Sequence, residues 1–180
     1  MWAAGSWPVP DGLAEASIGT ERLVLSPLRV ADAEELAGVL GDPALHEFIG
    51  GRPDTLEALR RRYAAMVAGP GRPGELWRNW VLRRRADEAA VGTVQATLTR
   101  HGEGWRAEVA WVVGVPWQGR GYAVEAARAL VGWLEAAGVG EIVAHIHPGH
   151  VASARVAAAA GLVATDDEVD RERVWRFRGR

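Results

Sequence analysis

An apolar segment, a glycine-rich turn and a helical pattern follow one another without interruption in the second half of the chain. Residues 105–115 alternate and then become continuously apolar, which is typical of a buried strand. Residues 121–137 carry apolar side chains at helical spacing, and Gly138 follows as a common helix-ending residue. Between the two segments, Gly119 and Gly121 can adopt positive φ and have no Cβ atom to obstruct a ligand. Because a helix N-terminus carries unpaired N–H groups and partial positive charge, this turn is suited to binding a phosphate.

The remaining segments predict an α/β (α+β) protein built on one mixed sheet. Strands are predicted at residues 22–29, 76–84, 89–100 and 141–147, and helices at 31–40, 54–68 and 151–160. Residues 162–180 are expected to form one or two strands around an acidic turn at Asp166, Asp167 and Glu168. The resulting order, β-α-α-β-β-β-α-β-α-β, places helices on the faces of the sheet.

The first 19 residues differ in character from the rest of the chain. They contain Trp2 and Trp7 but no periodic pattern, so residues 1–19 are expected to form an N-terminal arm. The two tryptophans favour packing of this arm on its own domain or on a second copy in a homodimer. Residues 20–180 show no repeat and no break in composition, and we expect them to form a single domain.

The composition excludes several classes of chemistry. All 21 basic residues are Arg and there is no Cys, which excludes lysine Schiff bases, cysteine nucleophiles, disulfides and zinc thiolates. A net charge of −2 gives no reason to expect nucleic acid or an anionic membrane as a partner. No apolar stretch approaches the roughly 18 residues of a membrane helix, and we expect a cytoplasmic location.

The segment Gln118-x-x-Gly121-x-Ala123 matches the Gln/Arg-x-x-Gly-x-Gly/Ala signature of the GNAT acetyltransferases, in the same place between strand and helix. A structural glycine turn is the alternative for this segment taken alone. Further landmarks in family order are Arg22-Leu-x-Leu-x-Pro-Leu, Ala31-Asp-Ala-Glu-Glu-Leu, Asp42-Pro, Val91-Gly-Thr and Ala107-Glu-Val. Over about residues 20–163 the chain resembles the branch that includes the ribosomal-protein N-terminal alanine acetyltransferases.

The resemblance implies the GNAT fold, which is a mixed, mostly antiparallel sheet with helices on both faces and a splayed strand pair. It implies acetyl-CoA as co-substrate and no metal. The main chain of Val113 and Val115 would bind the pantetheine arm, and the glycine-rich turn would hold the pyrophosphate. The implied cofactor-binding residues are Val113, Val115, Gln118, Gly119, Arg120, Gly121, Tyr122, Ala123, His150 and Ser153.

Two of these positions carry open questions. Arg120 either meets a phosphate or is a solvated loop arginine. His150 stands where the family has an asparagine that contacts pantetheine. Its imidazole can replace one of the asparagine's hydrogen bonds but not both, which puts cofactor affinity in doubt at this position.

The resemblance also implies two catalytic residues for direct attack of an amine on the thioester. Glu108 corresponds to a family glutamate that acts as a base through water, and we expect it to be buried; its alternative is a structural ion pair with an arginine such as Arg106. Ser153 corresponds to a serine that donates a proton to sulfur, and its alternative is an ordinary first-turn helix serine. Many GNAT enzymes use a tyrosine at the position of Ala157, so that donor is missing here.

The acceptor is expected to be a primary amine, either on a peptide N-terminus or on a small molecule. By resemblance, residues 42–62 form part of the acceptor wall, where His46, Glu47 and Phe48 could help to select the amine. The sequence does not identify the amine further.

Two other functions remain open at this stage. A GNAT-fold protein could bind acyl-CoA without turning it over, as the missing tyrosine and the altered asparagine suggest. Alternatively, His145, His147 and His150 could form a three-histidine zinc site of a hydrolase, because residues two apart on a strand share a face.

Overall fold

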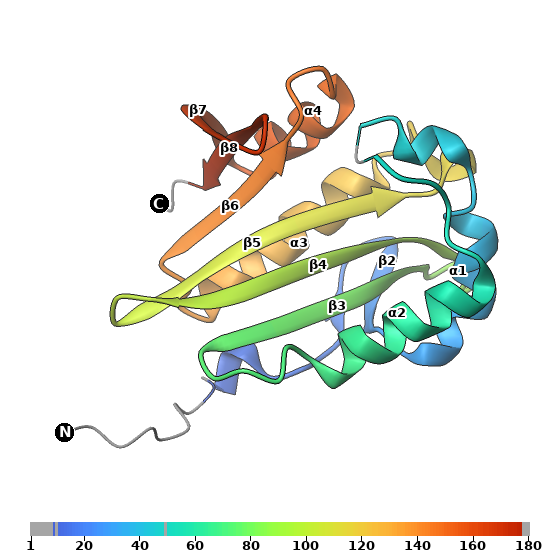
Figure 1. Ribbon diagram of the computed structural model, residues 1–180, viewed down its shortest axis with the longest axis horizontal. Coiled ribbons are helices and arrows are strands. Elements are labelled where there is room, and N and C mark those ends of the chain that lie inside the picture. The colour runs from blue at the N-terminus through green and yellow to red at the C-terminus, as the bar shows by residue number, and fades with distance from the viewer. Residues whose placement is uncertain (1–8, 10, 49, 178–180) are drawn as a thin grey trace.

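The computed structural model describes residues 9, 11–48 and 50–177, and within them eight strands form one sheet. The strand order is β1-β2-β3-β4-β5-β6-β8-β7, and every neighbouring pair is antiparallel except β5 with β6 (Figure 1). The strands are β1 (Ile18–Gly19), β2 (Leu23–Pro27), β3 (Glu75–Arg84), β4 (Ala90–His101), β5 (Gly104–Val113), β6 (Glu141–Ile146), β7 (Leu162–Val169) and β8 (Glu172–Phe177). The predicted mixed, mostly antiparallel sheet is therefore confirmed.

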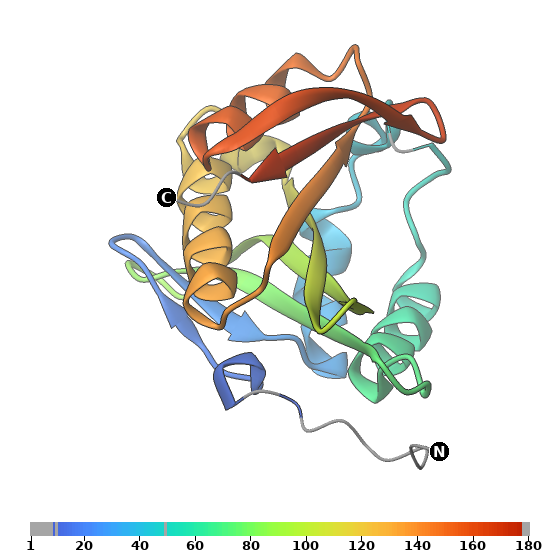
Figure 2. The same ribbon diagram turned by 90° about the vertical axis from the view of Figure 1, so that its left-hand side faces the viewer.

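Helices cover both faces of this sheet. The α-helices are α1 (Ala33–Val39), α2 (Leu56–Ala68), α3 (Tyr122–Ala136) and α4 (Val151–Ala159), and the 3-10 helices are η1 (Asp11–Leu13), η2 (Val30–Asp32), η3 (Pro43–His46) and η4 (Val115–Trp117). Helix α3 crosses one face, with α4 packed beside it, and α1 and α2 lie on the other face (Figures 1 and 2). Among the described residues, no helix has the length and apolar character needed to cross a membrane.

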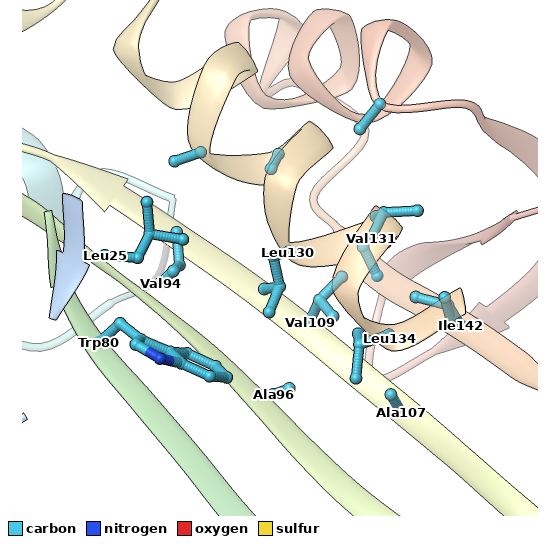
Figure 3. Packing of buried hydrophobic residues seen from close by; sticks show 14 of the residues in the cluster. Leu25, Trp80, Val94, Ala96, Ala107, Val109, Leu130, Val131, Leu134 and Ile142 are labelled. Atoms are coloured by element: carbon cyan, nitrogen blue, oxygen red, sulfur yellow. The ribbon is translucent and has the colours of Figure 1, made fainter. Parts of the chain in front are cut away.

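Helix α3 supplies much of the core on its face of the sheet. Its apolar residues recur every three or four positions, so Leu130, Val131 and Leu134 point towards the strands (Figure 3). There they pack with Trp80 of β3 and Val109 of β5, which are also buried. Since α3 follows β5 through one short turn, this packing fixes the start of the helix relative to the end of the strand.

Strands β5 and β6 begin side by side and then separate. Their parallel pairing runs from Arg106 opposite Glu141 to Glu108 opposite Val143 and goes no further. Beyond that point β6 pairs on its other side with β8, and the two strands diverge towards the start of α3 (Figure 1). The expected splayed strand pair is present, and it leaves one edge of β5 without a neighbouring strand.

Part of the expected N-terminal arm packs on the sheet. Leu13 is fully buried in the main core, and β1 pairs with β2. The indole N–H of Trp80 donates a hydrogen bond of 2.8 Å to the carbonyl of Ala16. The predicted roles of Trp2 and Trp7 fall outside the described residues.

The predicted acidic turn near the C-terminus is wrong. Asp166, Asp167 and Glu168 lie within β7, where the pairing with β8 shifts register. The turn instead consists of Asp170 and Arg171, which adopt φ of 51° and 70°. Two positive φ angles give a two-residue turn the twist that suits neighbouring antiparallel strands, and this geometry was not evident from an Asp-Arg pair.

Candidate active site

A cleft of about 730 Å³ lies between the end of β5, the start of α3, the start of α4 and the segment after η3. Trp111 of β5 and Arg155 of α4 line it, although neither was predicted as a site residue. Arg120 does not line the cleft, and its guanidinium lies over the ring of Trp117 at 5.2 Å. The predicted cofactor-binding residues that the cleft brings together are Val113, Val115, Gln118, Gly119, Gly121, Tyr122, Ala123, His150 and Ser153.

The turn between β5 and α3 presents a row of free amides. Among the described residues, the N–H groups of residues 119–124 donate to no acceptor. Gly119 and Gly121 adopt φ of 72° and 80°, which glycine tolerates best. A Cβ atom added at Gly119 would have no neighbour within 4 Å, so the space beside the main chain is open. Free amides, open space and the positive end of α3 together fit a diphosphate.

The turn is tied to β5 from within. The side-chain amide of Gln118 donates a hydrogen bond of 3.0 Å to the carbonyl of Val113. The side chain of Gln118 therefore stabilises the shape of the turn, in addition to any contact that it makes with a ligand.

Arg22, the residue before β2, stabilises the same turn, and it was not predicted as a site residue. Its Nη1 donates to the carbonyl of Arg120 at 2.9 Å, and its Nε donates to Glu125 of α3 at 2.7 Å. Burial by itself would raise the pKa of Glu125, but hydrogen bonds from Thr20 and Arg22 outweigh it, and the pKa is lowered. Arg22, which belongs to the first family landmark, thus contacts the first turn of α3 across 103 positions of sequence.

The free edge of β5 presents main-chain groups to the gap. The N–H of Gly114 donates to the carbonyl of Val91 on β4 at 2.9 Å. Because such bonds alternate along an antiparallel strand, the main chain of Trp111 and Val113 faces away from β4, towards the gap. Val115 lies beyond the strand in η4, where its carbonyl already accepts a hydrogen bond. The carbonyl of Val113 also accepts a hydrogen bond, from the side chain of Gln118, but its N–H stays free among the described residues. The main chain of Trp111 and the N–H of Val113 are therefore better placed than Val115 to pair with an extended ligand.

Ser153 is held by a residue of β5. The indole N–H of Trp111 donates a hydrogen bond of 3.1 Å to its Oγ. The Ser153 hydroxyl makes no hydrogen bond to the main chain of another described residue, as an ordinary first-turn serine would. Its own proton is therefore available to the cleft.

His150 contacts the segment after η3. Its ring stacks on that of Phe48 with centroids 4.4 Å apart and planes at 15°. Burial, and secondarily the charge of His147, lowers the pKa of His150, while Glu47 opposes this change. The side chain makes no capping hydrogen bond at the start of α4.

The expected burial of Glu108 is wrong. Its side chain is 53% exposed, because α1 and α2 cover the sheet face at β4 and β3 and leave this part of β5 open. Its partner is also not Arg106, which pairs with Glu141 at 3.2 Å. Instead Glu108 Oε1 lies 3.3 Å from Nδ1 of His145 on β6, whose Nε2 is buried and has no partner among the described residues.

The structure gives the zinc alternative no support within the described residues. No three side chains of His, Cys, Asp or Glu there form a group that could hold a metal ion. His145 contacts Glu108, Nδ1 of His147 accepts from the N–H of Gly149, and His150 stacks on Phe48.

A family model described as an acetyltransferase (GNAT) domain matches residues 22–163. The chain belongs to the GNAT acetyltransferases. The predicted family is thereby confirmed, and the cleft lies where the GNAT signature Gln118-x-x-Gly121-x-Ala123 was found. No curated protein matches this GNAT chain in sequence.

Solved GNAT structures share its fold. An acetyltransferase from Agrobacterium tumefaciens is 24% identical, with 93% of this chain and 96% of that chain covered and a TM-score of 0.71. A spermidine N-acetyltransferase from Vibrio cholerae in complex with CoA and spermine is 15% identical. The match covers 86% of this chain and 93% of that chain, with a TM-score of 0.69. A ribosomal L7/L12 α-N-protein acetyltransferase in complex with coenzyme A is 14% identical. The match covers 89% of this chain and 97% of that chain, with a TM-score of 0.75.

Proposed function

We propose that the chain transfers an acetyl group from acetyl-CoA to a primary amine by direct attack of the amine on the thioester. The observation that supports this most is the row of free amides at residues 119–124, at the wide end of the gap between β5 and β6. Two GNAT structures of similar fold are complexes with coenzyme A, which supports the same ligand here. Their substrates, a polyamine and a ribosomal protein, are consistent with an amine acceptor.

We assign the cofactor contacts to the main chain first. The amides of residues 119–124 bind the pyrophosphate, and the free edge of β5 at Trp111 and Val113 pairs with the amides of pantetheine. Arg120 and Arg155 are exposed cations beside this path and add attraction for the phosphates. His150 can donate one hydrogen bond in place of the family asparagine.

Bound acetyl-CoA supplies an electrophilic acetyl carbon and a thiolate leaving group. Glu108 accepts the proton released by the amine, through water, as its exposure on the open sheet face allows. His145 orients this carboxylate through the 3.3 Å contact of Nδ1 with Oε1. In the step, the N–C bond forms, the C–S bond breaks, and the amine's proton passes to Glu108.

Ser153 lies on the other side of β5. Val112 lines a cavity on the α2 face, and the neighbouring Trp111 packs against the α3-side core, so successive side chains point to opposite faces. Trp111 directs its indole N–H to the Ser153 oxygen, which leaves the serine proton free to stabilise the departing sulfur. The proposed base, Glu108, and the proposed proton donor, Ser153, therefore lie on opposite faces of the sheet beside the gap.

Two variants test these roles, with thiol release from acetyl-CoA as the assay. Glu108→Gln is expected to lower kcat/KM by about a hundredfold, since a positioned base contributes at least that much. The control Glu103→Gln makes the same change in the exposed turn between β4 and β5 and is expected to leave kcat/KM unaltered. Equal rates for both variants would remove Glu108 from the mechanism.

Acyl-CoA binding without turnover is the second candidate, and the buried Ala157 in place of the family tyrosine favours it. Coenzyme A binding by calorimetry, with no thiol release across a panel of peptides, amino acids and polyamines, would establish that role. A homodimer, a cytoplasmic location and the action of residues 20–180 as one domain stay predictions.

A further inference from the structure

A second cavity, of about 270 Å³, lies on the sheet face that α1 and α2 cover. Its walls are mostly apolar and include Leu36 of α1 with Leu59 and Met66 of α2. It shares Leu45 and Val112 with the cofactor cleft, so the two spaces meet at β5. A group held in this cavity would therefore lie next to the path of the thioester.

Uncharged polar side chains also line this mostly apolar space, and they include Tyr63, Asn79 and Gln95. Tyr63 is 1% exposed, and its Oη has no hydrogen-bond partner among the described residues. Asn79 and Gln95 lie opposite each other on β3 and β4, and neither carboxamide is hydrogen-bonded to another described residue. Burial raises the pKa of Tyr63 to about 12, although nearby Arg62 opposes the rise. The phenol is therefore neutral and can donate a hydrogen bond at physiological pH.

The charged groups of the cavity are already compensated. Asp54 and Arg62 form an ion pair of 2.7 Å. The ring of His46 directs Nδ1 to the carbonyl of Gly50 at 3.1 Å. Consequently neither a buried ammonium nor a buried carboxylate would find an unpaired counter-charge, and burying an unpaired charge is strongly unfavourable.

We infer that this cavity holds the substituent of the acceptor amine, and that the substituent is uncharged, partly apolar and carries a hydrogen-bond acceptor for Tyr63. The apolar walls bind its hydrocarbon part, and Asn79 and Gln95 satisfy further polar atoms. A buried hydroxyl without a partner lowers stability, and a ligand that supplies the partner removes that penalty. The inference rests on the proposed acetyl transfer and specifies its acceptor.

Four five-carbon amines that differ only at the far end test the charge preference. They are 5-aminopentanamide, 5-aminopentanoate, 1,5-diaminopentane and pentylamine, each assayed by thiol release. The carboxamide is expected to exceed the carboxylate and the diamine in kcat/KM by at least about tenfold, because their charges would be buried unpaired. Equal rates, or a preference for either charged amine, would overturn the inference.

The variant Tyr63→Phe tests the hydrogen bond and keeps the shape of the ring. KM for 5-aminopentanamide is expected to rise about three- to tenfold, as for one lost uncharged hydrogen bond, while KM for pentylamine and for acetyl-CoA stays constant. The melting temperature should stay equal or rise, because the removed hydroxyl has no partner in the free protein. The control Thr99→Val removes a hydroxyl from β4 outside the cavity and should change none of these values.

An unaltered KM for the carboxamide in Tyr63→Phe would show that the phenol contacts no acceptor, and the inference would fail. The proposed function fails in a different way, by absence of coenzyme A binding and of thiol release with every amine tested. Acetylation of all four amines without discrimination would leave the proposed function intact and refute only the account of this cavity.

Discussion

Gly119 and Gly138 form a matched pair at the two ends of helix α3. They have φ of 72° and 76°, and an added Cβ atom would have no neighbour within 4 Å at either position. Alanine at either site would therefore suffer the same left-handed backbone strain, about 1–2 kcal/mol. For a chain of 180 residues this corresponds to a fall in Tm of about 2–8 °C.

The two variants should differ in their response to coenzyme A. At a concentration of about 100 times Kd, the ligand stabilises the native state by about 2.7 kcal/mol, and Tm rises by about 5–11 °C. We expect this rise in the wild type and in Gly138→Ala. In Gly119→Ala the methyl group occupies space beside the phosphate-binding amides, and we expect it to prevent one hydrogen bond to a phosphate. The loss of one hydrogen bond to a charged group costs about 2 kcal/mol, which raises Kd for coenzyme A about thirtyfold.

Thermal unfolding by differential scanning fluorimetry or calorimetry, with and without coenzyme A, measures both effects. The prediction is a similar Tm for the two variants without ligand, and a rise of only about 2–3 °C for Gly119→Ala at the coenzyme A concentration used for the wild type. An equal rise in both variants would refute the reasoning, since Gly138 lies at the other end of α3 from the turn.

Leu13→Ala should lower the free energy of unfolding by about 2–5 kcal/mol in urea titrations, because Leu13 is fully buried; a change below about 0.5 kcal/mol would show that this segment is not part of the folded core. Trp111→Phe should lower kcat about three- to tenfold by releasing the Ser153 hydroxyl, with Kd for coenzyme A nearly constant, and an unchanged kcat would contradict the positioning role. The folded-state pKa of His150 is lowered, so its contribution to stability is complete above the unfolded pKa of about 6.5 and is lost as pH falls from there to the folded pKa. The Tm of the wild type relative to His150→Gln should therefore fall between pH 7 and pH 5, and a constant difference would contradict this.

Local sequence patterns predicted the elements around the cleft well. Helix α3 was expected at residues 121–137 and is observed at Tyr122–Ala136. Strand β5 was expected to reach residue 115 but ends at Val113, because Pro116 lies in the 3-10 helix η4 rather than in the strand. Periodicity and glycine placement are properties of neighbouring residues, and they suffice for a strand, a turn and a helix.

The contacts that shape the site are not local, and the sequence could not predict them. The bond from Trp111 to Ser153 spans 42 positions, and the stack of Phe48 on His150 depends on where η3 lies in space. The exposure of Glu108 has the same origin, because it depends on which strands the helices α1 and α2 cover. A strand pattern shows which side chains share a face, but it does not show what covers that face.

The central claim is that the amides of residues 119–124 bind the pyrophosphate of coenzyme A, and amide NMR spectroscopy tests it directly. In a ¹H–¹⁵N correlation titration with coenzyme A, the amide protons of Gly119 to Val124 should shift downfield as they form hydrogen bonds to phosphate oxygens. Pantetheine, which lacks the diphosphate, should leave them in place and shift the resonances of Trp111 and Val113. Unchanged resonances for residues 119–124 at saturating coenzyme A would contradict the account.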